Sequence, residues 1–338
     1  MDIRIFERTI VGAGFVALFM WLVGQTALAV STVVNCNKGE SIQAAVDAAA
    51  IGVLTEITIK GTCTEDVTNT NDDMTFRGHN NNSTVDGKIT IIGAQRVTID
   101  DLNVNSVSVL NNASVTFNDA TIESDGSTAV TALRSAVVVM ENTTVEATGN
   151  GACAVFIGDG SVVHMNGGNE LTNDAPSFSC ATLSVYRNST ARIRGSGNSI
   201  TNEDTVTGGP NSGNAGGFAL DIEMVSSLRI DGTGPATING NVESFNLSTV
   251  DLRKVVVTGG IYADGLTANV RLRGNSAGDV VVNGDVFPGS PGRVGIRNNG
   301  QVIINGNIDC TNGEDVIQNF IHFGNPATDG YVNCSFFP

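Results

Sequence analysis

The chain has 338 residues and a formal net charge of −16, from 34 acidic and 18 basic side chains. This acidic balance argues against nucleic acids and anionic membrane surfaces as partners. Glycine is plentiful at 40 residues while aromatic residues make up 5%, a composition that suits tight corners and polar outer surfaces.

Residues 1–29 have the features of a secretory signal peptide. Arg4 and Arg8 precede an apolar run from Thr9 to Val23, and Ala27-Leu28-Ala29 provides small residues for cleavage. The sequence therefore predicts a secreted protein, periplasmic or extracellular, with a mature domain of residues 30–338. An uncleaved membrane anchor is the alternative. Nothing later in the sequence is apolar for long enough to span a bilayer.

Residues 41–50 predict a short amphipathic helix. Ile42, Ala45, Val46 and Ala49 follow the spacing of one helical face, and Ser41 is a favourable N-cap. Such a helix before a run of strands is expected to cap the open first coil of a solenoid. A partner-binding helix is the alternative.

A five-residue pattern recurs from Ile57 onward: apolar, variable, apolar, polar, then Gly, Asn or Asp. Copies begin at Ile57, Met74, Val97, Val115, Val138, Val163, Ala191, Leu228, Val255, Val280 and Val302, with further copies between them at Ile89, Ala236 and Val270. Each copy predicts a strand that ends in a turn, with its first and third residues facing the core. Corresponding copies lie about 23 to 28 residues apart, with about three strands per period, which is typical of a parallel β-helix. We therefore expect an all-β solenoid of roughly eleven or twelve coils, about 55 Å long at about 4.8 Å per coil.

Two segments depart from the repeat. The long step from Ala191 to Leu228 predicts a coil with an extra loop at Asn202–Gly217. Residues 311–338 lose the pattern and gather aromatic residues, which predicts a C-terminal cap over the last coil. A carbohydrate-stacking platform could use the same aromatic residues.

Six cysteines fall into three pairs, with about one coil period within each pair: Cys36 and Cys63, Cys153 and Cys180, and Cys310 and Cys334. Neighbour pairing places every pair on adjacent coils, about 4.8 Å apart, close to the separation that disulfides prefer. Three disulfides imply an oxidising compartment. Thiol redox chemistry or metal binding is the alternative, but Cys-x-x-Cys motifs and clustered histidines are absent from the sequence.

The N-terminal part of the mature chain resembles the pectin-lyase-like superfamily of parallel β-helix repeat (PbH1-type) proteins. The resemblance is carried by Cys36–Ala49, Ile57–Thr62, Met74–Gly78 and Thr84–Gly87, read as a lid helix followed by three characteristic corners. It implies a single-stranded right-handed parallel β-helix in a secreted setting, often at the cell surface, with extracellular polysaccharide as a partner. It does not imply an activity, because the superfamily includes lyases, hydrolases, epimerases and proteins without known chemistry.

Basic residues are scarce, so their grouping on outward strand positions is informative. Arg192, Arg194, Arg229 and Asp231 are expected to lie within a coil or two of each other and are the candidate residues for a ligand-binding patch. Guanidinium groups suit bidentate recognition of carboxylates and sulfates of an acidic polysaccharide. For these residues taken alone, the sequence favours the other interpretation, a solvated ladder in which the arginines balance nearby carboxylates. The face on which Arg271 and Arg273 lie is left open.

Paired carboxylates offer another route to chemistry, as acid and base or as calcium ligands. The candidate pairs are Asp72 with Asp73, Asp100 with Asp101, Glu123 with Asp125, and Asp221 with Glu223. None stands in a recognisable lyase, calcium or polygalacturonase motif, and His79, His164 and His322 are far apart in the sequence. We therefore predict no cofactor, leave Ca²⁺ open without a motif to support it, and assign no catalytic residue.

The sequence favours a secreted β-helix protein that is structural or binds extracellular polysaccharide without catalysis. The alternative is a polysaccharide lyase or epimerase that acts on an acidic glycan and uses an arginine near Arg192, Arg194 and Arg229.

Overall fold

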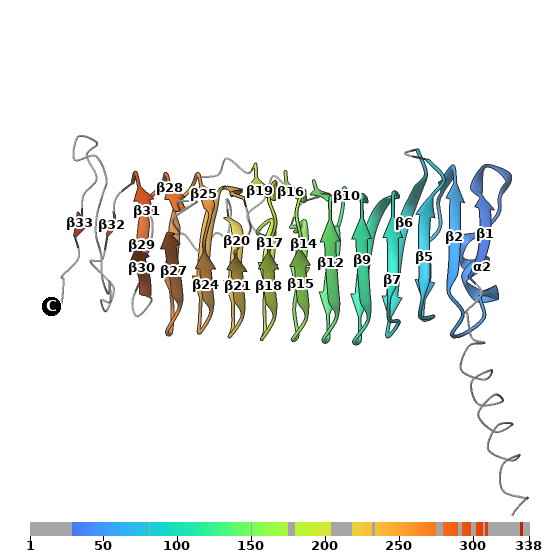
Figure 1. The fold of residues 1–338 in the computed structure, drawn as a ribbon, viewed down its shortest axis with the longest axis horizontal. Coiled ribbons are helices and arrows are strands. Elements are labelled where there is room, and N and C mark those ends of the chain that lie inside the picture. Colours follow the sequence, from blue (N-terminus) through green and yellow to red (C-terminus); the bar gives the residue numbers. More distant parts are fainter. Residues whose placement is uncertain are drawn as a thin grey trace, which may run out of the picture.

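The protein is a parallel β-solenoid, in which short strands stack along one long axis (Figure 1). The computed structural model describes residues 29–80, 82–149, 151–174, 180–203, 218–231, 234–274, 280–289, 293–298, 302–306, 308–309 and 332–333. Every strand pairing among these residues is parallel. Each coil contributes strands to three stacked surfaces around one apolar core.

The first surface is a twelve-stranded sheet, which we call sheet A. Its strands, in spatial order, are β1 (Val30–Asn35), β2 (Thr55–Lys60), β5 (Met74–Gly78), β7 (Val97–Asp100), β9 (Ser114–Asn118), β12 (Val137–Glu141), β15 (Val162–Met165), β18 (Thr190–Ile193), β21 (Ser227–Ile230), β24 (Thr249–Leu252), β27 (Asn269–Gly274) and β30 (Arg293–Asn298). The spatial order follows the chain order, so one coil adds one strand.

Two further stacks, ladders B and C, complete the coils. Ladder B contains β3 (Thr62–Cys63), β10 (Thr121–Ser124), β13 (Thr144–Ala147), β16 (Glu170–Asn173), β19 (Ser199–Asn202), β22 (Ala236–Asn239), β25 (Val255–Val257), β28 (Val280–Val282) and β31 (Val302–Ile304). Ladder C contains β4 (Val67–Asn69), β11 (Val130–Leu133), β14 (Val155–Ile157), β17 (Leu183–Val185), β20 (Phe218–Glu223), β23 (Asn241–Phe245), β26 (Ile261–Asp264), β29 (Val286–Pro288), β32 (Ile308–Asp309) and β33 (Val332–Asn333). The longer strands β6 (Thr84–Ile92) and β8 (Asn103–Leu110) pair with members of both ladders.

The recurrent sequence pattern has the structural meaning that was predicted from it. Its first and third residues point into the core: in β9, for example, Val115 and Phe117 are 2% and 0% exposed. In the copies that begin at Val97, Val115 and Val138, the fifth residue takes a left-handed backbone conformation, with φ of 47° at Asp101, 48° at Asp119 and 48° at Asn142. Gly, Asn and Asp tolerate that conformation best, which is why the pattern ends on them.

The assignment of later copies to corresponding strands was wrong. Val255, Val280 and Val302 were placed in the same series as Leu228, but they begin strands of ladder B. The neighbour of Leu228 in sheet A is Val250, followed by Val270. The error arose because strands of sheet A and of ladder B both end in glycine-containing corners, so the five-residue pattern does not distinguish the two surfaces.

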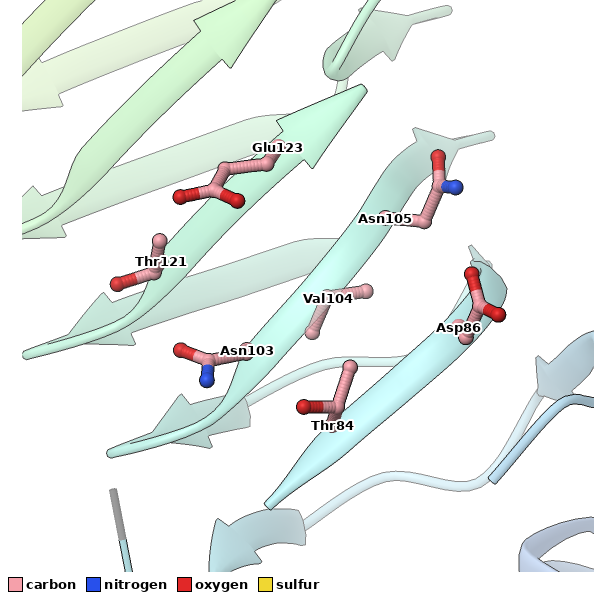
Figure 2. Close-up of a pocket in the computed structure, with 7 residues that line it drawn as sticks. All are labelled: Thr84, Asp86, Asn103, Val104, Asn105, Thr121 and Glu123. Carbon is pink, nitrogen blue, oxygen red and sulfur yellow. The ribbon is translucent and has the colours of Figure 1, made fainter. Parts of the chain in front are cut away.

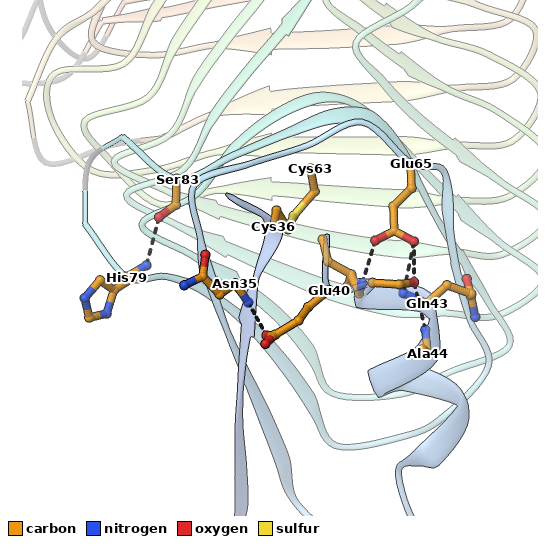
Figure 3. Close-up of a disulfide and its surroundings, with 11 residues drawn as sticks. Asn35, Cys36, Glu40, Gln43, Ala44, Cys63, Glu65, His79 and Ser83 are labelled. Carbon is orange, nitrogen blue, oxygen red and sulfur yellow. Dashed lines mark hydrogen bonds between the residues drawn. A yellow bond between two sulfur atoms is a disulfide. The ribbon is translucent and has the colours of Figure 1, made fainter. Parts of the chain in front are cut away.

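A short helix closes the N-terminal end, as predicted. Helix α2 (Ile42–Ala48) follows the 3-10 turn η1 (Cys36–Lys38), and Ile42 and Val46 are buried against the first coils. The Ser41 hydroxyl caps the helix by accepting from the amide of Ala44 at 3.1 Å. Glu65, from the following coil, accepts hydrogen bonds from the Ser41 hydroxyl at 2.7 Å and the Ile42 amide at 2.5 Å (Figure 3).

Replacing Glu65 with glutamine should loosen this cap. The change removes the charge that faces the helix N-terminus and turns an amide NH₂ group toward the same donors, which we expect to cost about 1 to 2 kcal/mol of local stability. Hydrogen exchange should become faster in β1, α2 and β2 and stay unchanged beyond β9. The control is Glu170→Gln, the same change at an exposed position of β16. Equal protection of the cap in both variants would contradict the role of Glu65.

Two of the three predicted disulfides are present: Cys36–Cys63 and Cys153–Cys180, each spanning 27 residues. Their Cα atoms are 5.2 Å and 5.1 Å apart, as expected for staples between adjacent coils. Figure 3 shows the first of them beside the helix cap.

The third predicted disulfide is not among the bonds that the structure describes. Cys310 and Cys334 both lie outside the described residues, although Asp309 and Asn333, which directly precede them in the sequence, are partners in the parallel register of β32 and β33. The pairing of Cys310 with Cys334 therefore stays a prediction. The predicted signal peptide, most of the extra loop and nearly all of the C-terminal cap also lie outside the described residues.

Candidate functional site

Arginines gather on the outer face of sheet A in its C-terminal half. In the parallel register Arg192 lies beside Arg229, Arg229 beside Asp251, and Asp251 beside Arg271. A second outward position follows two residues later in each strand or just after it. We call the following group the arginine face: Arg192, Arg194, Arg229, Arg253, Arg271 and Arg273, with Asp231 and Asp251.

The structure brings together the four residues predicted as a ligand-binding patch. Nη2 of Arg192 lies 2.8 Å from Oδ2 of Asp231, and Nε of Arg229 lies 2.9 Å from the same oxygen. Nε of Arg194 lies 3.9 Å from Oδ1 of Asp231. Three guanidinium groups therefore share one carboxylate, and their side chains keep 33 to 46% of their surface exposed.

A second cluster continues the first along the solenoid axis. Asp251 lies 3.1 Å from Nη2 of Arg253 and 3.2 Å from Nε of Arg273. The structure also settles the position of Arg271, which is exposed on the outer face next to Asp251. Sequence reasoning missed Arg253 and left Arg271 and Arg273 unplaced. The signal that could have found them was the shorter coil period after Leu228.

The arginines lower the pKa values of two neighbouring side chains, Asp231 and His164. Burial by itself would raise the pKa of Asp231, but the hydrogen bond from Arg192 and the charges of Arg229, Arg192 and Arg194 outweigh it and hold the pKa below its ordinary value. On the adjoining strand, His164 lies beside Arg192 in the register. Burial lowers the pKa of His164, and the charges of Arg194 and Arg192 lower it further, so this imidazole is neutral at pH 7.

This arrangement is suited to holding anions. Two partly buried aspartates fix the guanidinium groups, while the excess of arginines leaves positive charge facing solvent in a protein of net charge −16. Fixed guanidinium groups recognise carboxylate, sulfate and phosphate oxygens by charge-assisted, often bidentate hydrogen bonds. The carboxylates of Asp231 and Asp251 are both paired with arginines and balance part of the positive charge of this face.

Ion pairs also occupy two of the carboxylate pairs predicted as candidates. Asp73 accepts from Nε of Arg96 at 2.6 Å, and Asp100 accepts from Nε of Arg77 at 2.7 Å. Each pair joins neighbouring coils on the surface of sheet A. The hydrogen bond and the charge of Arg96 hold the pKa of Asp73 below its ordinary value. Asp73 and Asp100 therefore balance the charge of arginines on the neighbouring coil.

Glu123, from a third predicted pair, lines a small depression on ladder B (Figure 2). Side chains from β6, β8 and β10 surround it, including Asp86, Asn103 and Asn105. Its volume of about 170 Å³ is below the usual range for small-molecule sites. In Figure 2 the carboxylates of Asp86 and Glu123 stand on separate strands with Asn105 between them, so they do not form a close pair.

The fourth predicted pair, Asp221 and Glu223, lies on a different surface from the arginines. Both are on β20 in ladder C, where Asp221 neighbours Glu243 and Glu223 neighbours Phe245. Glu243 in turn neighbours Tyr262, and Phe245 neighbours Asp264. We call this group the carboxylate–aromatic patch: Asp221, Glu223, Glu243, Phe245, Tyr262, Asp264 and Phe287.

The patch combines repelling carboxylates with packed aromatic rings. The Tyr262 ring meets Phe218 edge-on at 5.9 Å and Phe287 at 6.5 Å between centroids. Burial, with the charges of Glu223 and Asp264, raises the pKa of Glu243 to about 7. Burial and the charges of Glu223 and Glu243 raise the pKa of Asp221 well above its ordinary value, and its Oδ1 is buried without a hydrogen-bond partner. Sequence reasoning missed Glu243, which is far from Asp221 in the chain.

Within the described ranges, no group of His, Cys, Asp and Glu side chains is arranged to hold a metal ion. The same part of the chain contains no helix with the length and apolar character needed to cross a membrane. Neither finding extends to the residues outside it.

Comparisons with known proteins give no family for this chain. A scan of family models finds no match, and no similar curated protein or solved structure is found. The architecture is therefore identified from the structure itself: the chain is an all-β, parallel β-solenoid with a helix at its N-terminal end.

Proposed function

We propose that this protein is a secreted parallel β-helix protein that binds acidic polysaccharide through its arginine face, without catalysis. The observation that carries the proposal is the alignment of six arginines over four successive strands of a protein with net charge −16. The strands repeat at about 4.8 Å, so the face offers a regular row of guanidinium groups to a linear polyanion.

The secreted setting rests on the predicted signal peptide and on two disulfides between adjacent coils, which are typical of oxidising compartments. The resemblance of the N-terminal coils to pectin-lyase-like proteins supports a right-handed winding and a polysaccharide partner. Membership of that superfamily is part of the proposal.

Binding is favoured over lyase or epimerase chemistry by the contacts of the arginines. An arginine that abstracts a proton must first be neutral, and a carboxylate partner stabilises its charged form. Arg192, Arg194 and Arg229 all surround Asp231. Their guanidinium groups are fixed by this carboxylate, which suits recognition of an anion.

The test is binding of the purified protein to polygalacturonate, alginate and dextran sulfate, with uncharged dextran as the reference. The double variant Arg271→Ser with Arg273→Ser should bind the acidic polymers about thirtyfold more weakly, since the two lost charge-assisted contacts contribute on the order of 1 kcal/mol each. The control is Arg134→Ser with Arg187→Ser, which removes the same charge outside the arginine face. Equal loss in both variants, or binding to dextran as tight as to the acidic polymers, would refute the proposal. Ultraviolet absorbance of unsaturated sugar products, recorded in parallel, would reveal a lyase instead.

A further inference from the structure

The arginine face and the carboxylate–aromatic patch occupy the same coils. Arg192 on β18 and Asp221 on β20 belong to one turn of the chain, and Arg229 on β21 and Glu243 on β23 belong to the next. The two surfaces are therefore level along the axis and opposite in charge. They meet at the corner where ladder C turns into sheet A.

That corner carries an exposed apolar ridge. Met224, Val225, Leu247 and Leu266 are 39%, 56%, 53% and 65% exposed. Backbone hydrogen bonds stack them on one another, from the Val225 amide to the Asn246 carbonyl and from the Leu247 amide to the Leu266 carbonyl. In the four preceding coils this corner is formed by polar residues and glycine: Asn111, Asn112, Arg134, Ser135, Asp159, Gly160, Arg187 and Asn188.

The apolar residues of the ridge stand where the backbone disfavours them. Met224, Val225 and Leu247 have φ of 50°, 66° and 65°, in the left-handed region that β-branched and bulky residues rarely adopt. Asn188, at the equivalent corner of the preceding coil, has φ of 61° and is a residue type that tolerates this conformation. The ridge thus combines local backbone strain with apolar exposure, a combination that favours a role in contact with a partner.

We propose that the partner is a second copy of this chain, whose arginine face docks on the carboxylate–aromatic patch. The charges are complementary: the arginine face has six arginines against two aspartates, and the patch has four carboxylates. Neighbouring carboxylates repel one another in the single chain. Guanidinium groups of the second copy offset this repulsion, and they also stack on aromatic rings such as Tyr262.

The shape of the solenoid gives this contact a defined geometry. Both surfaces share the ridge as their common edge. Turning one copy about the ridge, with the solenoid axes parallel, lays its arginine face on the patch of the next copy. The same coils then stay level, and the apolar ridges of successive copies come together. Because the two surfaces are different, the contact is heterologous, and rotation about the ridge without translation arranges successive copies in a ring.

The test is sedimentation of the wild type over a range of concentrations at low and high salt. We expect assembly at low salt that weakens by about tenfold or more in high salt, since the contact is largely electrostatic. Glu243→Arg alone and Arg229→Glu alone should each remain monomeric. An equimolar mixture of the two variants should assemble as the wild type does, with the variants alternating. The reversed patch of one then faces the reversed arginine face of the other, and the two unchanged surfaces pair as in the wild type.

Val225→Asn distinguishes the contribution of the ridge to assembly from its contribution to folding stability. It should raise the thermal midpoint, because asparagine relieves the left-handed strain, and it should weaken assembly by about tenfold through loss of apolar contact. A higher thermal midpoint together with weaker assembly distinguishes a docking ridge from a corner with a purely structural role.

Several results would overturn the proposal. These are a wild type that stays monomeric at low salt, assembly that survives Glu243→Arg, or a variant mixture that does not associate. A monomeric wild type that binds a glycan and loses this binding with Tyr262→Ala would assign the patch to sugar instead. A second copy and a polyanion compete for the arginine face. Polyanion binding is therefore measured on Glu243→Arg, which is expected to be monomeric and retains that face, so failure of either proposal leaves the other testable.

Discussion

Glu243→Gln is expected to stabilise the protein by about 3 kcal/mol at about pH 9 and to have little effect near about pH 4. The reason is the position of Glu243 in the carboxylate–aromatic patch. Burial and the charges of Glu223 and Asp264 raise its pKa to about 7, and Asp221 and Tyr262 flank it in the register. Above that pKa the folded state holds a poorly solvated charge that the unfolded chain holds in water.

The sign of this pH dependence of stability follows from proton linkage. A carboxyl group whose pKa is raised on folding stabilises the folded state while it is protonated, and this contribution is lost as the pH rises through the folded pKa. The difference in unfolding free energy between variant and wild type should therefore grow between about pH 4.5 and about pH 7.5 and then level off. Asp221, whose pKa is also raised, should act in the same direction in Asp221→Asn.

The measurement is denaturant unfolding of wild type and variant at matched pH values, at a salt concentration that keeps both monomeric. Comparing the two cancels the titration of carboxylates common to both. The low-pH data serve as the internal control, because the side chain at position 243 is then neutral in both proteins. A difference that is constant with pH would show that Glu243 is well solvated, and one that shrinks as pH rises would show that the folded protein stabilises its charge.

Removal of the Cys36–Cys63 disulfide, by Cys36→Ala with Cys63→Ala, should destabilise the N-terminal coils by about 3 to 4 kcal/mol in the chain-entropy model. The bond closes a 27-residue loop at the end of the solenoid, where only one neighbouring coil supports the structure. Opening should therefore spread inward from the helix cap. Hydrogen exchange should show lost protection in α2, β1 and β2.

The matched control is Cys153→Ala with Cys180→Ala, which opens a loop of the same length in the middle of the solenoid. Coils on both sides hold this region, so local protection should fall less than at the N-terminal end. If both variants lose equal protection locally, the Cys36–Cys63 disulfide stabilises its coils no more than the disulfide in the middle of the solenoid does. If neither loses protection, stacking alone holds the coils together.

Some of the arginines and carboxylates that meet across coils can be predicted from the sequence, and others cannot. Arg192, Arg194 and Arg229 were found because the outward positions of one strand are two residues apart and neighbouring strands were correctly matched. Arg253 was missed because the coil after Leu228 is shorter than the assumed period. Glu243 was missed because its partner in the register, Asp221, belongs to another coil, and no local pattern records which residues become neighbours.

The amino-acid sequence by itself determined the solenoid, the helix cap and the two described disulfides. Alternating apolar residues, left-handed corner positions and cysteine spacing are local or periodic features, and a stacked coil repeats them. Only the tertiary structure decided which side chains face each other across coils. The register depends on the length of every intervening corner, so the full arginine face, the carboxylate–aromatic patch and the apolar ridge between them emerge only once the coils are stacked.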